Sequence, residues 1–251
     1  MYHVIARGNE RKKIFLEKED YRDFLSRFKT ALDKTGGKCL AWCLMPNHFH
    51  LLILRGKKPL AELMRRLMTG YAIGFNIRHR RCGHLFQNRY KGILCDEEEY
   101  LKELVAYIHL NPLRAKPIHD FSELEKYKWC GHGALTGRHK AGFLERGYIL
   151  GHFGENEEKA VQGYETFLRD RQGKHKGGEY SGGGLIKSIG WNSRPAFFFK
   201  RFRQRGDLGK ENFEFIETGR MGQFSVREKQ RNLSHGNLRF CERRQNAPIL
   251  K

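Results

Sequence analysis

The chain has 251 residues, of which 39% are hydrophobic and 12% aromatic, enough for one sizeable domain with or without an appendage. Its 48 Lys and Arg residues against 28 Asp and Glu residues give a formal charge of +20, which favours nucleic acid as the partner; a generally solvated basic surface is the alternative. No stretch approaches the roughly 20 apolar residues that span a bilayer, and no leading segment resembles a signal peptide, so we exclude a membrane-spanning protein and expect a cytoplasmic location.

The first half of the chain alternates between strand and helix patterns. Strands are predicted by apolar or alternating runs, and helices by apolar residues spaced three and four apart. In chain order the predicted elements are a strand over 2–8, a helix over 17–37, strands over 38–45 and 48–54, a helix over 59–81, a strand over 84–95 and a helix over 97–110. Pro46 and Asn47 indicate a tight hairpin between the second and third strands.

This order of elements predicts an α+β fold, a ferredoxin-like split βαβ unit with a central antiparallel sheet. We expect helices to cover one face of the sheet, and the other face or one edge to stay open for a ligand.

The pattern weakens after residue 120. Short helices are predicted over 122–137 and 155–172, and the Gly-rich stretch 173–190 is typical of a linker or a backbone-mediated contact loop. We therefore divide the chain into three parts: a folded domain at 1–120, a helical and Gly-rich extension at 121–192, and a basic, partly disordered tail at 193–251.

Six cysteines are scattered along the chain without a CxxC pair. This favours reduced thiols over a disulfide framework. Cys39 and Cys43 could join His48 and His50 in a zinc site. The sequence has no second close pair of Cys or His residues, which disfavours a structural zinc site.

His48 and His50 alternate with apolar residues on the predicted strand 48–54. Side chains two positions apart on a strand share a face, roughly 6.6 Å apart along the backbone. Two imidazoles on such a rigid support can hold one metal ion. A pair of solvent-facing histidines is the other interpretation, and the pair alone does not decide between them.

Tyr107 and Asn111 stand four positions apart at the end of the predicted helix 97–110. They therefore share one helix face, about 6 Å apart. The Asn amide oxygen is a suitable ligand for a hard divalent ion, and a phenol beside that ion is a candidate nucleophile. The alternative is a core aromatic residue and a helix C-terminal cap before Pro112.

Paired histidines around one hydrophobic residue on a strand, with a tyrosine on a later helix, resemble the HUH single-tyrosine transposases of the IS200/IS605 type. The chain resembles the REP-associated tyrosine transposases more closely still. The stretches that carry the resemblance are YHVIARGNERKKIF, CLMPNHFHLLIL, GHLFQNRYKG and YIHLNPLRA, followed more loosely by YKWCGHGALTGR, FGENEEKAVQGYETF and GGGLIKSIG. Their ordered combination is specific, whereas any single stretch is not.

The resemblance implies that the 1–120 domain is the catalytic domain of a metal-dependent transposase. It would act on single-stranded DNA, at imperfect hairpins formed by palindromic repeats. His48 and His50 match the family's histidine pair, Tyr107 matches the nucleophile that forms a 5′-phosphotyrosine, and Asn111 matches the third metal ligand. Mg²⁺ or Mn²⁺ suits such a mixed nitrogen and oxygen site, with zinc as the competitor.

Basic side chains cluster around the first strand and on or after the second helix. They would bind DNA phosphates without reading sequence. The predicted DNA-binding residues are Arg7, Arg11, Lys12, Arg65, Arg66, Arg78, Arg80, Arg81, Arg89, Tyr90 and Lys91. A non-catalytic hairpin-binding protein derived from such a transposase remains the alternative function, and relatives of this type act as monomers or homodimers.

Overall fold

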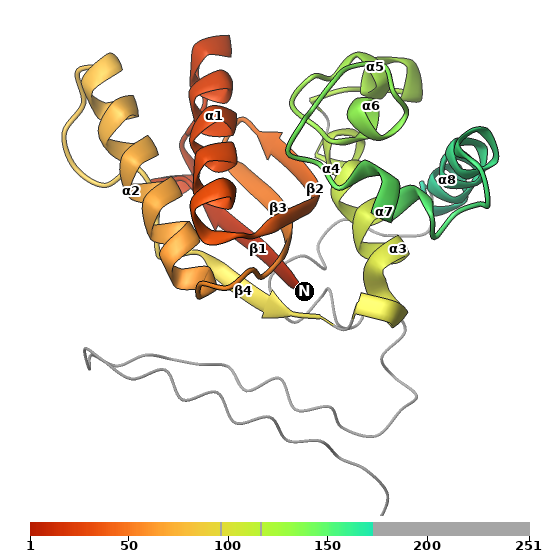
Figure 1. Cartoon of the computed structure of the whole chain (residues 1–251). Helices are drawn as coiled ribbons and strands as arrows, with labels where there is room; N and C mark the ends of the chain where they lie inside the picture. The colour runs from red at the N-terminus through yellow and green to blue at the C-terminus, as the bar shows by residue number, and fades with distance from the viewer. Residues whose placement is uncertain (96, 116, 173–251) are drawn as a thin grey trace, which may run out of the picture. The chain divides into compact units, whose positions relative to one another are not determined.

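The computed structural model describes residues 1–95, 97–115 and 117–172 (Figure 1). Its first elements are β1 (Tyr2–Arg7), α1 (Lys18–Thr35), β2 (Lys38–Met45), β3 (His48–Leu54), α2 (Leu60–Arg78), β4 (Lys91–Leu94) and α3 (Glu97–His109), with a short 3₁₀ turn at Asn9–Arg11. Five shorter or later helices follow: α4 (Asn111–Arg114), α5 (Phe121–Lys126), α6 (His132–Leu135), α7 (Arg146–Leu150) and α8 (Glu157–Arg171).

The four strands form one sheet in the order β2-β3-β1-β4, and its three strand pairs are all antiparallel. This order confirms the predicted ferredoxin-like split unit and α+β class. The register of β1 against β3 places Arg7 opposite His48 and Ile5 opposite His50. Directly paired residues share a face of the sheet, so His48, His50 and the β1 residues opposite them point to the same side.

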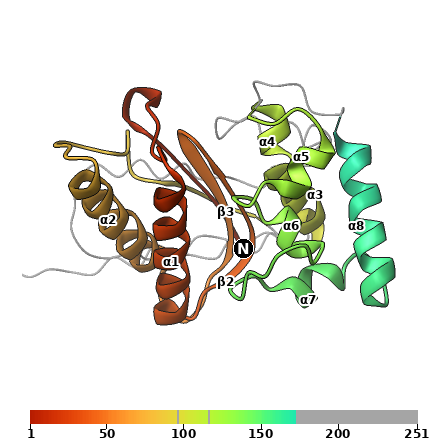
Figure 2. The same cartoon turned by 90° about the horizontal axis from the view of Figure 1, so that it is seen from above.

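Helices α1 and α2 cover one face of the sheet (Figure 2). Phe24 and Phe28 of α1 and Tyr71 of α2 pack there with Phe49 and Leu51 of β3, all of them fully buried. The three-and-four spacing that predicts these helices therefore also identifies their buried sides. Gly36, in the left-handed conformation with φ of 70°, ends α1.

The opposite face of the sheet is also covered, so our expectation of an open face is wrong. Helix α3 packs against β2 and β3, and the helices of the extension lie on the same side (Figure 2). Leu104 and Ile108 of α3 share a core with Leu40 of β2 and Leu52 of β3. The nearly continuous apolar run of β2 explains this, because a strand buried on both faces has no need of polar residues at alternate positions.

Two predicted elements are shorter than expected. Only Lys91–Leu94 of the predicted strand 84–95 joins the sheet, because Leu85 and Phe86 instead run past the end of β1, where Phe86 bridges Gly8. The predicted helix 122–137 is split into α5 and α6, because the backbone between them pairs with the edge of β2 through Trp42 and Leu44.

The predicted helix 155–172 corresponds to α8, which begins at the Asn156 N-cap. The short helices α4 and α7 were not predicted. The Gly-rich stretch 173–190 and the tail at 193–251 lie outside the described residues. Among the residues that the structure does describe, no helix is both long enough and apolar enough to cross a membrane.

A buried carboxylate joins the start of α1 to the end of α2. Asp20, 0% exposed, accepts hydrogen bonds from the backbone amides of Leu16 and Glu17, from the Arg78 guanidinium at 2.6 Å and from His79 at 2.9 Å. Burial raises the pKa of Asp20, but these hydrogen bonds outweigh it and hold the pKa below its ordinary value. The network therefore depends on a charged carboxylate with several donors.

A second buried polar network joins α3 to the extension. The Tyr164 hydroxyl of α8 lies 2.8 Å from Nδ1 of His109 on α3 and 2.9 Å from Nδ1 of His132 on α6. Burial lowers the pKa of His109 well below its ordinary value and that of His132 to about 4. Both imidazoles are therefore neutral at pH 7, and Tyr164 can donate to one ring and accept from the other.

The Asp20 network predicts that Arg78 stabilises the fold. Substitution Arg78→Gln removes a charged donor from a buried carboxylate and should lower the free energy of unfolding by about 1–3 kcal/mol. The exposed neighbour Arg80 provides the control, because Arg80→Gln should change stability by less than about 0.5 kcal/mol. Denaturant titrations that give the two variants equal stability would contradict the structural role.

The His132 network predicts acid sensitivity. The folded-state pKa of about 4 lies below the ordinary 6.5, so the unfolded chain binds more protons between these values. The contribution of neutral His132 to the free energy of unfolding is complete above pH 6.5 and is lost as the pH falls toward 4. Between pH 7 and pH 5 the loss from His132 should be about 2 kcal/mol, so His132→Gln should show a correspondingly smaller decrease. An unaltered profile in His132→Gln would refute the assignment.

Candidate active site

The structure brings the histidine pair and Tyr107 together within one chain. The rings of His48 and His50 on β3 have centroids 5.2 Å apart, and the Tyr107 ring of α3 lies edge-on to His50 at 5.8 Å. His50 is 3% exposed and Tyr107 is 4% exposed, whereas His48 is only partly buried. The packing of α3 over the histidine face of the sheet therefore juxtaposes residues that are some sixty positions apart in sequence.

His3 is a third histidine at this site, and our sequence reasoning missed it. Its Nε2 atom lies 3.0 Å from Nδ1 of His50, and the two rings stack at 5.2 Å with an interplanar angle of 18°. The His3 ring also meets the edge of Tyr107 at 5.7 Å. The signal was present in the strand alternation, because His3, Ile5 and Arg7 share one face of β1, but only the pairing register shows that this face meets His50.

Asn47 was predicted as a turn residue, and the structure gives its side chain two hydrogen bonds. Its Oδ1 atom lies 2.6 Å from Nδ1 of His48, and its Nδ2 donates to the carbonyl of Arg11 at 3.2 Å. Its own carbonyl accepts from the amide of Gly8. Gly8 is required here because a Cβ atom would lie 2.1 Å from the carbonyl oxygen of Lys12. The basic loop after β1 is thereby attached to the β2–β3 turn, next to His48.

All three imidazoles of the site are held neutral. Burial lowers the pKa of His3 to about 3, and burial together with the nearby Arg7 guanidinium lowers the pKa of His48 to about 4. The pKa of His50 lies well below its ordinary value because of burial and the charges of His3, His48 and Arg7. A neutral imidazole has a free lone pair, which is the form that ligates a metal ion. The Nδ1 atoms of His48 and His50 already have hydrogen-bond partners, so their Nε2 atoms are the ones available to bind a metal ion.

Asn111 lies one helical turn after Tyr107, at the junction of α3 and α4. Its Nδ2 donates to the backbone carbonyl of Tyr107 at 3.0 Å, and its side chain is buried. This is the capping contact that the sequence offered as the alternative to metal ligation. The hydrogen bond uses the amide nitrogen, so the amide oxygen keeps its ligand chemistry. Two neutral imidazoles and one amide oxygen suit a divalent ion such as Mg²⁺ or Mn²⁺.

The predicted DNA-binding residues do not gather in one place. Arg7 lies beside His48, and Arg11 is connected to it through Asn47. The residues on α2 lie across the sheet from the histidines, where Arg65 and Arg66 both pair with Glu62. The other positions are exposed at Lys12, Arg80, Arg89 and Lys91, partly buried at Arg81 and Tyr90, and ion-paired with Asp20 at Arg78.

Glu17, Asp20 and His79 form a second group of possible metal ligands, with donor atoms within 4.8 Å of one another. Among the described residues this is the one such cluster of His, Cys, Asp or Glu side chains. The Arg78 guanidinium lies 2.6 Å from Asp20, so an added cation would face a fixed positive charge. The cluster is already neutralised from within the chain.

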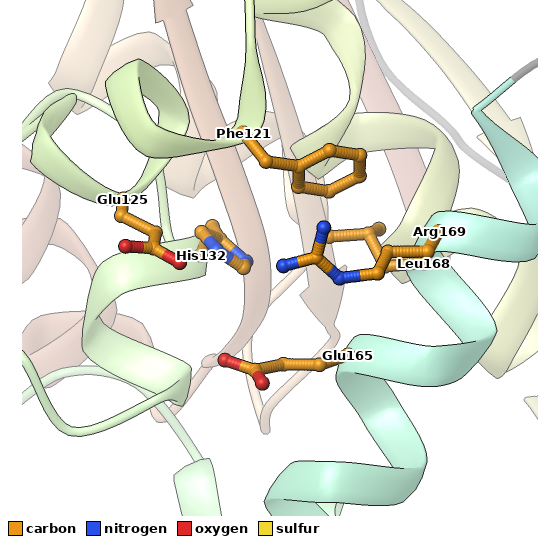
Figure 3. Close-up of a pocket in the computed structure, with 6 residues that line it drawn as sticks. All are labelled: Phe121, Glu125, His132, Glu165, Leu168 and Arg169. Atoms are coloured by element: carbon orange, nitrogen blue, oxygen red, sulfur yellow. The ribbon is translucent and has the colours of Figure 1, made fainter.

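A small polar hollow lies between α5, α6 and α8 (Figure 3). The Arg169 guanidinium lies over the Phe121 ring at 4.7 Å, and the His132 imidazole faces the same space (Figure 3). The remaining lining residues are Glu125, Glu165 and Leu168. The hollow is too narrow to admit a water molecule, so it is part of the packing of the extension and not a ligand site.

Comparison with known proteins finds a similarity over the first part of the chain. The sequence profile of the family described as "Transposase IS200 like" matches residues 1–111. A REP-associated tyrosine transposase bound to a REP hairpin is 14% identical, covering 55% of this chain and 78% of its own with a TM-score of 0.44. A protein of Deinococcus radiodurans R1 assigned as a transposase is 16% identical, covering 41% and 84% with a TM-score of 0.33. A search of curated proteins found no match. Over residues 1–111, the chain is therefore similar to the IS200-like transposase family.

Proposed function

We propose that this chain is a transposase, a metal-dependent endonuclease and strand transferase for single-stranded DNA, acting at palindromic repeat hairpins like the REP-associated tyrosine transposases that it resembles. The observation that carries the proposal is the approach of the Tyr107 ring to the His50 ring, 5.8 Å between centroids, beside His48. A phenol next to two neutral imidazoles is the residue set that metal-assisted transesterification by tyrosine requires.

In this proposal His48, His50 and Asn111 hold one Mg²⁺ or Mn²⁺ ion. When bound, the ion would orient the scissile phosphate and neutralise the negative charge that develops on it. The site residues fit this role because burial keeps both imidazoles unprotonated and Asn111 supplies a hard oxygen donor. Their attachment to a strand and a helix, rather than to a free loop, keeps the donors in place.

Tyr107 would be the nucleophile. Its phenol loses a proton and the oxygen forms a bond to phosphorus as the bond from phosphorus to the 3′ oxygen breaks. The leaving 3′ oxygen takes up a proton, so the products are a 5′-phosphotyrosine and a 3′-OH. A second 3′-OH can reverse the step and join a new strand, because the phosphotyrosine conserves the energy of the broken bond. Tyr107 and His50 are almost fully buried, so a phosphodiester reaches them only if the surrounding groups move.

The DNA would lie against the basic loop after β1. Arg7 and Arg11 are exposed and lie nearest the histidine pair, so they are the first candidates for phosphate contacts. The other predicted DNA-binding residues would extend this contact around the sheet. Tyr107 and His50 of the same chain are in contact, which supports a complete site in each monomer that needs no partner subunit for the chemistry.

A non-catalytic hairpin-binding protein is the second candidate. The burial of Tyr107 and His50 favours it, because a site that never opens could retain the basic surface for binding and lose cleavage. The two candidates differ in one respect only, which is whether a covalent protein–DNA adduct forms.

Tyr107→Phe should abolish cleavage, because phenylalanine keeps the ring packing and lacks the attacking oxygen. The measurement uses a labelled hairpin oligonucleotide with Mn²⁺ and detects the protein–DNA adduct on a denaturing gel. Tyr100→Phe is the matched control, because it makes the same substitution at another tyrosine of α3, and it should leave adduct formation intact. Equal cleavage by Tyr107→Phe, or no adduct with wild type on any repeat hairpin tested, would reject the strand-transferase proposal, and hairpin binding without cleavage would select the non-catalytic alternative.

His48→Ala should lower the cleavage rate about 10³-fold, because a lost ligand removes several kcal/mol of charge stabilisation. Hairpin affinity should stay close to that of wild type, since phosphate contacts from basic side chains supply most of it. EDTA should stop cleavage by wild type, and added Mn²⁺ should restore it. Cleavage that persists in EDTA, or an unimpaired His48→Ala, would show that the metal assignment is wrong.

A further inference from the structure

The Nδ1 atoms of His48 and His50 each have one near neighbour in the structure. Nδ1 of His48 lies 2.6 Å from Oδ1 of Asn47, and Nδ1 of His50 lies 3.0 Å from Nε2 of His3. Neither neighbour belongs to the predicted site. Each contact engages the ring nitrogen that a ligand bound through Nε2 does not use.

The contact from Asn47 determines which nitrogen of His48 carries the proton. The Asn47 amide is oriented by its second bond, in which Nδ2 donates to the carbonyl of Arg11. The oxygen therefore faces His48, and an amide oxygen can only accept a hydrogen bond. Nδ1 of neutral His48 must be the donor, which leaves Nε2 unprotonated and free to bind a cation.

In the contact between His3 and His50 either imidazole can be the donor, so two directions are open. If His50 binds a cation through Nε2, its Nδ1–H donates to Nε2 of His3, and the proton of neutral His3 then sits on its own Nδ1. That Nδ1 atom is buried and has no hydrogen-bond partner in the part of the chain that the structure describes. The reverse direction would place a proton on Nε2 of His50 and block ligation.

We propose that His3 and Asn47 are positioning residues that hold His50 and His48 in the tautomer with Nδ1 protonated and Nε2 free. This inference rests on the proposed metal-dependent function and identifies what orients its two histidine ligands. An outer hydrogen bond that fixes the tautomer and ring angle of a ligating histidine also raises its basicity. In this direction the buried Nδ1–H of His3 has no acceptor among the described residues, a cost that the stacking of His3 on His50 and its packing against Tyr107 must offset.

Asn47 has a further consequence for the arrangement of the site. The two hydrogen bonds of its side-chain amide connect His48 to the carbonyl of Arg11, within the basic loop that carries Arg11 and Lys12. The same side chain therefore sets the angle of a metal ligand and the position of a loop proposed to contact DNA. Loss of this side chain should disturb both, whereas loss of His3 should leave His48 and the loop in place.

The first test reads the tautomers without metal. Long-range ¹H–¹⁵N correlation spectra of the full chain with labelled histidine distinguish a protonated from an unprotonated ring nitrogen. We expect Nδ1 protonated and Nε2 unprotonated in both His48 and His50. Asn47→Ala should give a mixture of tautomers at His48 only, and His3→Phe at His50 only. A protonated Nε2 at either residue of wild type would overturn the inference for that residue.

The second test measures Mn²⁺ affinity by titration of the full chain. His3→Phe keeps an aromatic ring and removes the acceptor, and should weaken Mn²⁺ binding about 10–100-fold, as should Asn47→Ala. His3→Gln should recover part of the loss, because its amide oxygen can accept from His50. The matched controls His119→Phe and Asn88→Ala, both at exposed positions, should bind Mn²⁺ like wild type.

The outcomes separate this inference from the proposed function. Unchanged Mn²⁺ affinity in both His3→Phe and Asn47→Ala would overturn the positioning role even if wild type cleaves DNA. Absence of Mn²⁺ binding by wild type would reject the metal site, and the metal-free tautomers would still decide the inference. Circular dichroism confirms folding, and if His3→Phe does not fold, Asn47→Ala and the wild-type tautomer of His50 carry the test.

Discussion

Antiparallel pairing of β1 with β3 places His3 diagonally across from His50 and Arg7 directly opposite His48. Side chains alternate faces along a strand, so a slip of one residue in this pairing would turn the β1 residues away from the histidines. Val4 and Ala6 would then leave the core under α1 and α2, where they are buried with Phe49 and Leu51. The packing of apolar residues on one face therefore determines the geometry of the polar residues on the other.

The second constraint is the position of α3, which supplies Tyr107. Its apolar residues Leu104 and Ile108 pack against β2 and β3, and His109 connects it to Tyr164 of α8. Arg171 of α8 also pairs with Glu103 of α3 at 2.6 Å. The extension after residue 120 thus holds in place the helix that carries the candidate nucleophile. Because α3 lies on the face of the sheet opposite α1 and α2, both faces of the sheet are covered.

The candidate site holds neutral imidazoles, although the chain as a whole carries a large positive charge. The protein is strongly basic, which favours an anionic partner. At the site, burial and the charge of Arg7 keep His48 and His50 unprotonated, so the imidazoles add no further positive charge. Neutral donors surrounded by basic side chains are suited to binding a cation and a phosphate together, because the protein charge attracts the DNA while the lone pairs remain available.

The sequence by itself determined the order of strands and helices, the ferredoxin-like class, and the common face of His48 and His50, because all of these follow from local periodicity in an antiparallel fold. It also carried the family resemblance through short motifs. The contact of Tyr107 with His50, the contact of His3 with His50 and the side-chain hydrogen bonds of Asn47 depended on strand register and on the packing of α3. These are long-range choices, decided by which apolar surfaces bury one another, and no window of neighbouring residues contains them.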